Sequence, residues 1–312
     1  MDVFREVGQI PEDFGPTAVT LGNFDGVHLG HREVLQALVG AARARRLRSL
    51  AMTFDPHPRA VHRPDCAPAE ITPTVLKLER MAQTGIDAAL VQTYTLDFAR
   101  QTPEEFVVGF LIGRLGARFI TVGRDVRFGT DNTGDLETLM ELGAQHGLEV
   151  EVTEEVGNGA RYSSTAVRAA LESGDVATAA QMLGVHHEVR GEVVHGDARG
   201  REMGFPTANL AQDALGAVPA DGIYAGLARF EGLDEVYPAA ISIGTNPTFD
   251  GHERRVEAHL IDVEFDGFDV YGRTMTLAFV DRIRGQVEFT GMEALIEQMR
   301  DDVERIRGIL AE

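Results

Sequence analysis

Two histidines three residues apart are the chain's clearest candidates for chemistry. They lie in Gly22-Asn23-Phe24-Asp25-Gly26-Val27-His28-Leu29-Gly30-His31, between an apolar strand pattern and a helical pattern. At the start of a helix this spacing places both imidazoles on one side, where their N–H groups and nearby backbone amides can contact a phosphate. Such donors stabilise charge that builds on the α-phosphate during in-line nucleotidyl transfer. The predicted contacts of a nucleoside triphosphate are Gly22, Asn23, Phe24, Asp25, His28 and His31.

Other interpretations of the histidine pair stay open on the pair alone. Histidines near a helix start are commonly a satisfied polar pair. A zinc pair needs a third and a fourth ligand, and the sequence offers neither a cysteine cluster nor a clear downstream histidine motif. Cys66 is the only cysteine, which also excludes an internal disulfide. Phosphate binding is favoured because a strand pattern precedes this segment, glycines lie within it and a helical pattern follows it.

The charge balance restricts the partners. The formal net charge is −20, with 49 acidic and 29 basic residues, which argues against non-specific binding to nucleic acid or to an anionic membrane. Of the 29 basic residues, Lys77 is the only lysine, and no glycine-rich loop precedes it. A Walker A site is therefore excluded, and ATP phosphates must be held by arginine, histidine, backbone amides and a divalent metal.

Two further segments are suited to the same ligand. Ser163, Ser164 and Thr165 precede a helical stretch, and Arg168 falls on its first turn, from which a guanidinium can fork onto the β- and γ-phosphates. Taken alone, this segment is a capped helix start. Asp125 follows another strand pattern and could bind a substrate hydroxyl or a metal-bound water, or only form a turn.

The first half of the chain alternates strand and helix patterns. Such alternation predicts a doubly wound parallel sheet of the Rossmann-like α/β class, with ligands beyond the carboxyl ends of its strands. The expected strands are 18–21, 50–54, 88–91 and 119–122, with a helix through 34–42.

The second half changes character near Gly184, which divides the chain into predicted domains 1–184 and 185–312. Short β-rich stretches separated by Gly and Pro turns predict a small antiparallel barrel. A terminal helix follows, with Thr290 and Glu293 in a capping-box pattern and one apolar face against the barrel. The expected strands are 189–194, 223–228, 239–243, 256–263 and 275–280.

The barrel half carries oxygen donors in alternating patterns. Thr207 and Asn209 alternate along an extended segment, so both could hold a magnesium ion that bridges ATP phosphates. Glu257 and His259 share one strand face, and Glu257 could accept the proton of an attacking hydroxyl. A Gly/Pro turn and a solvated strand face explain the same residues more simply.

These motifs, in sequence order, resemble the bacterial bifunctional riboflavin kinase/FAD synthetases of the prokaryotic type. In the first half the resemblance rests on Gly22 to His31, residues 53–58, Gly123 to Gly129 and Ser163 to Arg168. In the second half it rests on Gly200 to Asn209, residues 221–224, 243–249, 257–260 and 270–272. Two positions depart from the family pattern: Val126, where phenylalanine is common, and Tyr162, where an aliphatic residue is common.

The resemblance implies two activities. The C-terminal riboflavin kinase domain would phosphorylate riboflavin with ATP to FMN, and the N-terminal domain would adenylylate FMN with ATP to FAD and pyrophosphate. It implies Mg²⁺ for both, magnesium–ATP contacts at Gly204, Pro206, Thr207 and Asn209, and Glu257 as the base for the ribityl 5′-hydroxyl. Phe54, His57 and Pro58 are flavin candidates, because their motif follows a strand into the crevice.

Three alternatives stay open on the sequence alone. The chain could adenylylate another acceptor such as phosphopantetheine, could retain only one activity, or could be a non-catalytic flavin-binding protein. The N-terminus lacks a secretory pattern and no apolar run is long enough for a membrane helix, so a cytoplasmic protein is expected. The oligomeric state is open, a homo-oligomer included.

Overall fold

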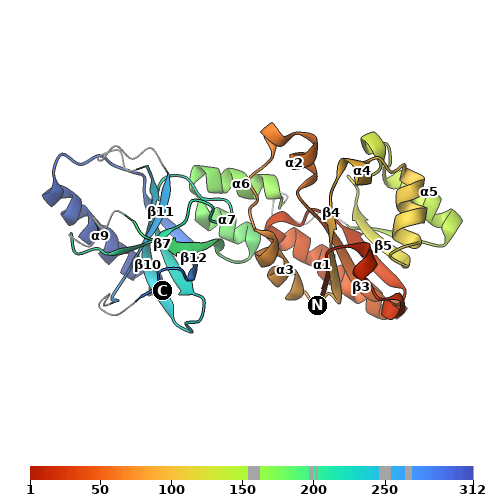
Figure 1. Cartoon of the computed structure of the whole chain (residues 1–312), viewed down its shortest axis with the longest axis horizontal. Helices are drawn as coiled ribbons and strands as arrows, with labels where there is room; N and C mark the ends of the chain where they lie inside the picture. Colours follow the sequence, from red (N-terminus) through yellow and green to blue (C-terminus); the bar gives the residue numbers. More distant parts are fainter. Residues whose placement is uncertain (154–161, 197–199, 201–202, 246–253, 264–268, 312) are drawn as a thin grey trace. The chain divides into compact units, whose positions relative to one another are not determined.

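The computed structural model describes residues 1–153, 162–196, 200, 203–245, 254–263 and 269–311. Contacts divide the chain into two compact units, residues 1–69 with 74–163 and residues 70–73 with 164–312 (Figure 1). These units are defined by contacts between residues and do not show which residues carry out which activity. The functional division into 1–184 and 185–312 therefore stays a prediction.

The first unit contains a six-stranded parallel sheet in the order β1-β4-β3-β2-β5-β6. The four expected strands are present as β2 to β5, and the two edge strands β1 and β6 were not predicted. The strands are β1 (Asp2–Phe4), β2 (Thr17–Leu21), β3 (Arg48–Asp55), β4 (Ala88–Thr93), β5 (Ala117–Gly123) and β6 (Glu149–Thr153). The helices are α1 (Leu29–Arg45), α2 (Pro58–His62), α3 (Thr74–Ala82), α4 (Leu96–Ala99), α5 (Leu136–His146), the 3-10 turn η3 (Asp25–Val27) and the π-helical η5 (Glu105–Ile112).

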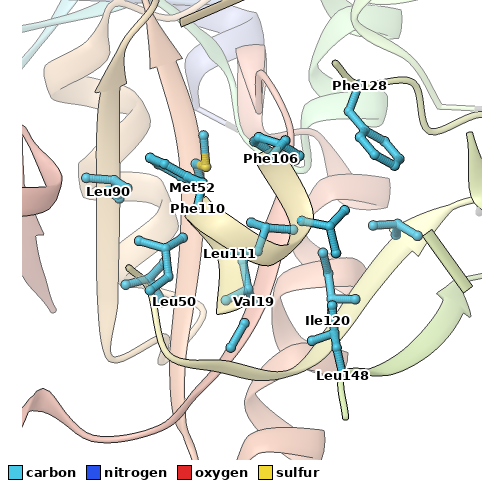
Figure 2. Packing of buried hydrophobic residues seen from close by; sticks show 14 of the residues in the cluster. Val19, Leu50, Met52, Leu90, Phe106, Phe110, Leu111, Ile120, Phe128 and Leu148 are labelled. Atoms are coloured by element: carbon cyan, nitrogen blue, oxygen red, sulfur yellow. The ribbon is translucent and has the colours of Figure 1, made fainter. Parts of the chain in front are cut away.

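Neighbouring residues of each strand pack against helices on opposite faces of this sheet. Val19, Leu50 and Met52 join a core with Phe106 and Phe110 of η5 (Figure 2). On the other face the strands pack against α1 and α3, and that core contains Ala18, Ala51, Ala89, Phe119, Leu35, Leu38 and Met81. The predicted doubly wound α/β fold is confirmed, because period-two alternation along buried strands needs a cover on both faces.

The second unit contains a closed antiparallel barrel in the order β10-β11-β8-β7-β12-β9. Closure leaves no unpaired sheet edge. The predicted barrel is confirmed, with β8 added where the sequence indicated only an extended segment. The elements are α6 (Ser164–Ser173), α7 (Val176–Leu183), β7 (His187–Val194), β8 (Thr207–Leu210), β9 (Gly222–Phe230), β10 (Val236–Gly244), β11 (Arg255–Leu260), β12 (Thr274–Arg284) and α9 (Met292–Leu310).

The terminal helix α9 packs on the barrel as expected, but the predicted capping box is wrong. Its N-cap is Gly291, with an extended backbone and no side-chain cap hydrogen bond, so Thr290 lies one residue outside the capping position. Val303 and Ile306 are buried among apolar residues of the barrel. These contacts, and not the cap, hold the helix.

One ion pair also fastens α9 to β12. The Arg284 guanidinium donates from Nε and Nη2 to the Asp302 carboxylate, with Nη2–Oδ2 at 2.7 Å. The Asp302 side chain is 7% exposed and that of Arg284 18%. Removal of one partner would leave the other charge poorly solvated.

We expect Asp302→Asn to lower the free energy of unfolding by about 3–5 kcal/mol, the usual cost of breaking a buried pair. Asp97→Asn is the matched control, because the Asp97–Arg100 pair is 87% and 76% exposed, and its loss should be much smaller. Urea denaturation followed by circular dichroism measures both variants. Equal losses would contradict the assignment.

Candidate active sites

The strand order of the first unit defines where a ligand would bind. β2 and β5 are neighbours, yet the chain continues from β2 towards β3 and from β5 towards β6 on the opposite side. Ligands of open α/β sheets bind beyond the carboxyl ends of strands at such a reversal. The segment after β2 begins at Gly22 and that after β5 at Arg124, so the predicted triphosphate turn and Asp125 follow the two strands at this reversal.

The turn after β2 has a strained backbone. Phe24, Gly26 and Val27 have φ values of 47°, 83° and 44°, and a left-handed conformation is unfavourable for a β-branched residue such as Val27. Two arginines donate to the carbonyl groups of this segment. Arg80 Nη1 lies 3.3 Å from the Gly26 oxygen, and Arg32 Nε lies 3.2 Å from the Val27 oxygen.

The histidine pair closes the turn at the start of α1. His28 is the N-cap, and its Nδ1 accepts a hydrogen bond from the His31 backbone N–H at 3.3 Å. The two rings stack with their centroids 3.6 Å apart and an interplanar angle of 18°. Because Nδ1 of His28 accepts, a neutral His28 carries its proton on Nε2. A side chain at Gly30 would place its Cβ 3.2 Å from His28 Nδ1, so glycine keeps room for the ring.

The environment of His31 favours its neutral form. Its Nδ1 is buried and has no hydrogen-bond partner among the described residues. Burial holds the pKa of His31 well below its ordinary value of 6.5, and the charges of His28 and Lys77 lower it further. His31 therefore enters a reaction near pH 7 as a neutral imidazole.

This pKa has a consequence for stability. Below about pH 6.5 the unfolded chain takes up a proton at His31 that the folded chain does not, so the free energy of unfolding falls as the pH drops. Between about pH 7.5 and pH 5, we expect the melting temperature of His31→Gln to fall less than that of the unsubstituted protein. Calorimetry across this pH range tests it, and parallel curves would refute the assignment.

The serine and threonine segment begins α6. Ser163 is the last residue of the first compact unit, and the second unit starts at Ser164. Ser164 and Thr165 lie in the first turn of α6, and Arg168 lies one turn further. The predicted helix is present, but it begins at Ser164, so Ser164 and Thr165 lie within it and the expectation that Arg168 lies on its first turn is wrong. The contact of these residues with triphosphate stays a prediction.

The three flavin candidates lie at the carboxyl end of β3 and the start of α2. His57 is the N-cap of α2, accepting from the Arg59 N–H at 3.1 Å, and Pro58 is its first residue. The ring of Phe54 contacts that of Tyr94 edge-on, with centroids 5.4 Å apart. Phe54 begins a series of aromatic contacts that the sequence analysis did not predict. The aromatic residue directly after β4, Tyr94, was the feature of the sequence that could have indicated it. The series continues through Tyr94, Phe98, Phe106 and Phe128.

The second unit contains a cavity of about 640 Å³ lined by residues of the barrel and α9. Thr207, Asn209 and Glu257 all line it. Glu257 pairs with Asn209 across β11 and β8, and His259 pairs with Thr207 two residues along. Burial along β11 alternates, with Val256, Ala258 and Leu260 buried, which confirms the predicted two-faced strand. Barrel closure thus brings the three predicted residues to one wall.

The oxygens of this wall suit a hard cation. Asn209 Oδ1 is buried with no hydrogen-bond partner among the described residues, and Asn209 Nδ2 lies 3.4 Å from Thr207 Oγ1. A Cβ at Gly196 would come within 2.5 Å of Asn209 Nδ2, so glycine is required beside the amide. Mg²⁺ prefers such oxygen donors together with phosphate oxygens. No cluster of three His, Cys, Asp or Glu side chains suited to a metal occurs in the described part of the chain.

The turn before β8 shapes the rim of the cavity. Gly204 has φ +83°, a conformation that favours glycine. The Pro206 carbonyl accepts a hydrogen bond from His259 Nδ1 at 2.9 Å. Burial lowers the pKa of His259 although this hydrogen bond opposes the shift. His259 therefore positions the turn as a neutral donor.

Sequence reasoning missed part of this cavity. Leu295, Met299 and Val303 of α9 line it, although their pattern predicted only packing on the barrel. Gln286 also lines it and donates from Nε2 to the Ile243 carbonyl at 2.8 Å. The cavity therefore combines oxygen donors of the barrel with apolar side chains of α9, as a ligand with an apolar ring and a polar chain requires.

Two family models match this chain in succession. Residues 10–166 match the model described as FAD synthetase, and residues 183–310 match the model described as riboflavin kinase. The chain belongs to the bifunctional riboflavin kinase/FMN adenylyltransferase family. It is an enzyme of flavin cofactor biosynthesis, and the family resemblance of its sequence motifs is confirmed. The histidine turn lies in the FAD synthetase region and Glu257 in the riboflavin kinase region.

Individual relatives support the family over nearly the whole length. The chain is 38% identical over 300 residues to the bifunctional riboflavin kinase/FMN adenylyltransferase of Escherichia coli (strain K12), covering 96% of this chain and 93% of the relative. Identity to the Bacillus subtilis (strain 168) enzyme of the same name is 35% over 299 residues, 94% of this chain and 92% of the relative.

One solved structure matches over the full length. The crystal structure described as a macrolide-efflux protein from Streptococcus pneumoniae superposes with a TM-score of 0.84 at 31% identity, covering 98% of both chains. In the described part of this chain, no helix is both long and apolar enough to span a membrane.

Proposed function

We propose that the barrel phosphorylates riboflavin with ATP to give FMN, and that the sheet unit adenylylates FMN with a second ATP to give FAD and pyrophosphate. One observation carries the division of labour: Thr207, Asn209 and Glu257 line one cavity, whereas His28 and His31 stack at the strand reversal of the other unit. The substrates are riboflavin, FMN and ATP. A cytoplasmic location and a homo-oligomer stay predictions.

In the kinase step Glu257 acts as the base. Its carboxylate accepts the proton of the ribityl 5′-hydroxyl while that oxygen attacks the γ-phosphorus of ATP and ADP leaves. Thr207 and Asn209 would hold Mg²⁺, which neutralises phosphate charge when bound. Gly204 and Pro206 shape the turn beside the phosphates. The apolar side chains of α9 receive the flavin ring.

In the adenylyl step the protein supplies positioning and charge. A phosphate oxygen of FMN attacks the α-phosphorus of ATP, and the bond to the bridging oxygen of pyrophosphate breaks. The imidazole N–H groups of His28 and His31 donate to the phosphate oxygens as charge develops. Phe54, His57 and Pro58 contact the flavin, and the ring of Phe54 is held in place by its edge-on contact with Tyr94. The further triphosphate contacts are Gly22, Asn23, Phe24, Asp25, Asp125, Ser163, Ser164, Thr165 and Arg168.

Two substitutions separate the activities. We expect His28→Ala to reduce FAD formation from supplied FMN by at least about 10²-fold while FMN formation from riboflavin is retained. Glu257→Gln should reduce FMN formation by a similar factor, because the base is lost, and should spare conversion of FMN to FAD. Chromatography of the flavins after incubation with ATP and Mg²⁺ measures both. Equal loss of both products in a folded variant would contradict the division.

The cation site of the barrel has a separate test. We expect Asn209→Ala to raise the Mg²⁺ concentration needed for half-maximal FMN formation by about tenfold or more, because one oxygen ligand is lost. The Mg²⁺ dependence of FAD formation from FMN should stay unchanged. Asn132→Ala, in the sheet unit, is the control for loss of an amide. An unchanged requirement in Asn209→Ala would remove Asn209 from the metal site.

A further inference from the structure

Lys77 has a largely buried side chain on a helix beside the phosphate turn. It lies on α3 and is 4% exposed. Its ammonium nitrogen is not one of the buried side-chain nitrogen atoms that lack a partner in the described residues. The apolar stem is therefore buried while the ammonium at its end keeps access to solvent. A ligand at the turn can reach this charge.

The face of α3 that carries Lys77 packs against the phosphate turn. Arg80 lies three residues further along the helix, hence on the same side, and donates to the Gly26 carbonyl. Met81, four residues from Lys77, packs in one core cluster with Phe24 and Val27. Lys77 is also close enough to His31 for its charge to act on that imidazole.

Two buried nitrogen atoms at the same turn lack partners. Arg32 Nη2 and His31 Nδ1 are both buried with no hydrogen-bond partner among the described residues. Lys77 and Arg32 bring two positive charges to the turn, and His31 adds a neutral imidazole, in a chain whose net charge is −20. These groups suit a compact, multiply charged anion.

The basic residue at position 77 is a lysine and not an arginine. This chain has arginine at 28 of its 29 basic positions and lysine only here. An ammonium is a compact point charge that fits beside a phosphate chain where a planar guanidinium needs more room. The only lysine of the chain therefore lies on the helix that packs against the phosphate turn.

We propose that Lys77 is a phosphate-binding residue of the adenylyl-transfer site and is the counter-charge for the β- and γ-phosphates of ATP and for the departing pyrophosphate. The proposal rests on the proposed function of the turn. When the α-phosphorus bond to the bridging oxygen breaks, its electron pair stays on pyrophosphate, and the new bond forms to the FMN phosphate oxygen. The ammonium stabilises the charge of the leaving group and transfers no proton.

Pyrophosphate is the probe, because it is a product of this site alone. In calorimetric titrations of the full-length protein, we expect Lys77→Met to weaken pyrophosphate binding at least tenfold and Lys77→Arg to give an intermediate affinity. Arg43→Met removes one positive charge from an exposed position of α1 and should stay within twofold. The KM for ATP in FAD formation should follow the same order, with FMN formation unchanged throughout.

Stability separates a ligand-binding lysine from a structural one. Without ligand, the melting temperature of Lys77→Met should equal or exceed that of the unsubstituted protein, because methionine keeps the buried apolar stem of the side chain. Pyrophosphate binding within twofold of the unsubstituted protein would overturn the proposal. If pyrophosphate binding depends on Lys77 but no FAD forms, the proposed function fails and the Lys77 assignment stands. If FAD forms at the same rate in Lys77→Met, the Lys77 assignment fails and the proposed function stands.

Discussion

Positive charge must be concentrated locally, because this chain of net charge −20 handles polyphosphates and repels anions over most of its surface. In the sheet unit, the reversal of strand order at β2 and β5 gives the backbone a place for an anion, and side chains of α1 and α3 add charge to it. Arg32 and Arg80 bind the carbonyl groups of the turn, so two cations also stabilise its left-handed residues.

The barrel lacks such nitrogen donors among its proposed ligands and offers oxygen atoms that would bind a cation. Register pairs Glu257 with Asn209, and barrel closure keeps that pairing because no strand edge is free to slip. A wall of carboxylate, amide and hydroxyl oxygens repels phosphate unless a divalent cation lies between them. Under the proposed function the two units would therefore bind polyphosphate with different protein groups, nitrogen donors in the sheet unit and oxygen ligands of a cation in the barrel.

Local patterns predicted most of the fold. Helix start, strand end and glycine positions are properties of short segments, so the turn at His28 and the strands flanking it followed from the sequence. The pairing of Asn209 with Glu257 depends on barrel register, which no short segment records. Edge strand β1 was too short to give a periodic pattern. The prediction of a capping box for α9 was wrong. A cap contributes only about 1 kcal/mol, and the packing of Val303 and Ile306 holds the helix without it.

Backbone strain and three of the six buried side-chain atoms without a partner in the described residues occur at the two proposed sites. Val27 has a left-handed backbone, and His31 Nδ1, Arg32 Nη2 and Asn209 Oδ1 are buried without partners in the described residues. Each raises the free energy of the unliganded fold. A ligand that satisfies these groups binds the folded state alone and recovers that energy as affinity. Under the proposed function, the same atoms that weaken the empty protein would prepare it for a polyphosphate, and the apolar cores on both faces of the sheet supply stability that offsets their cost.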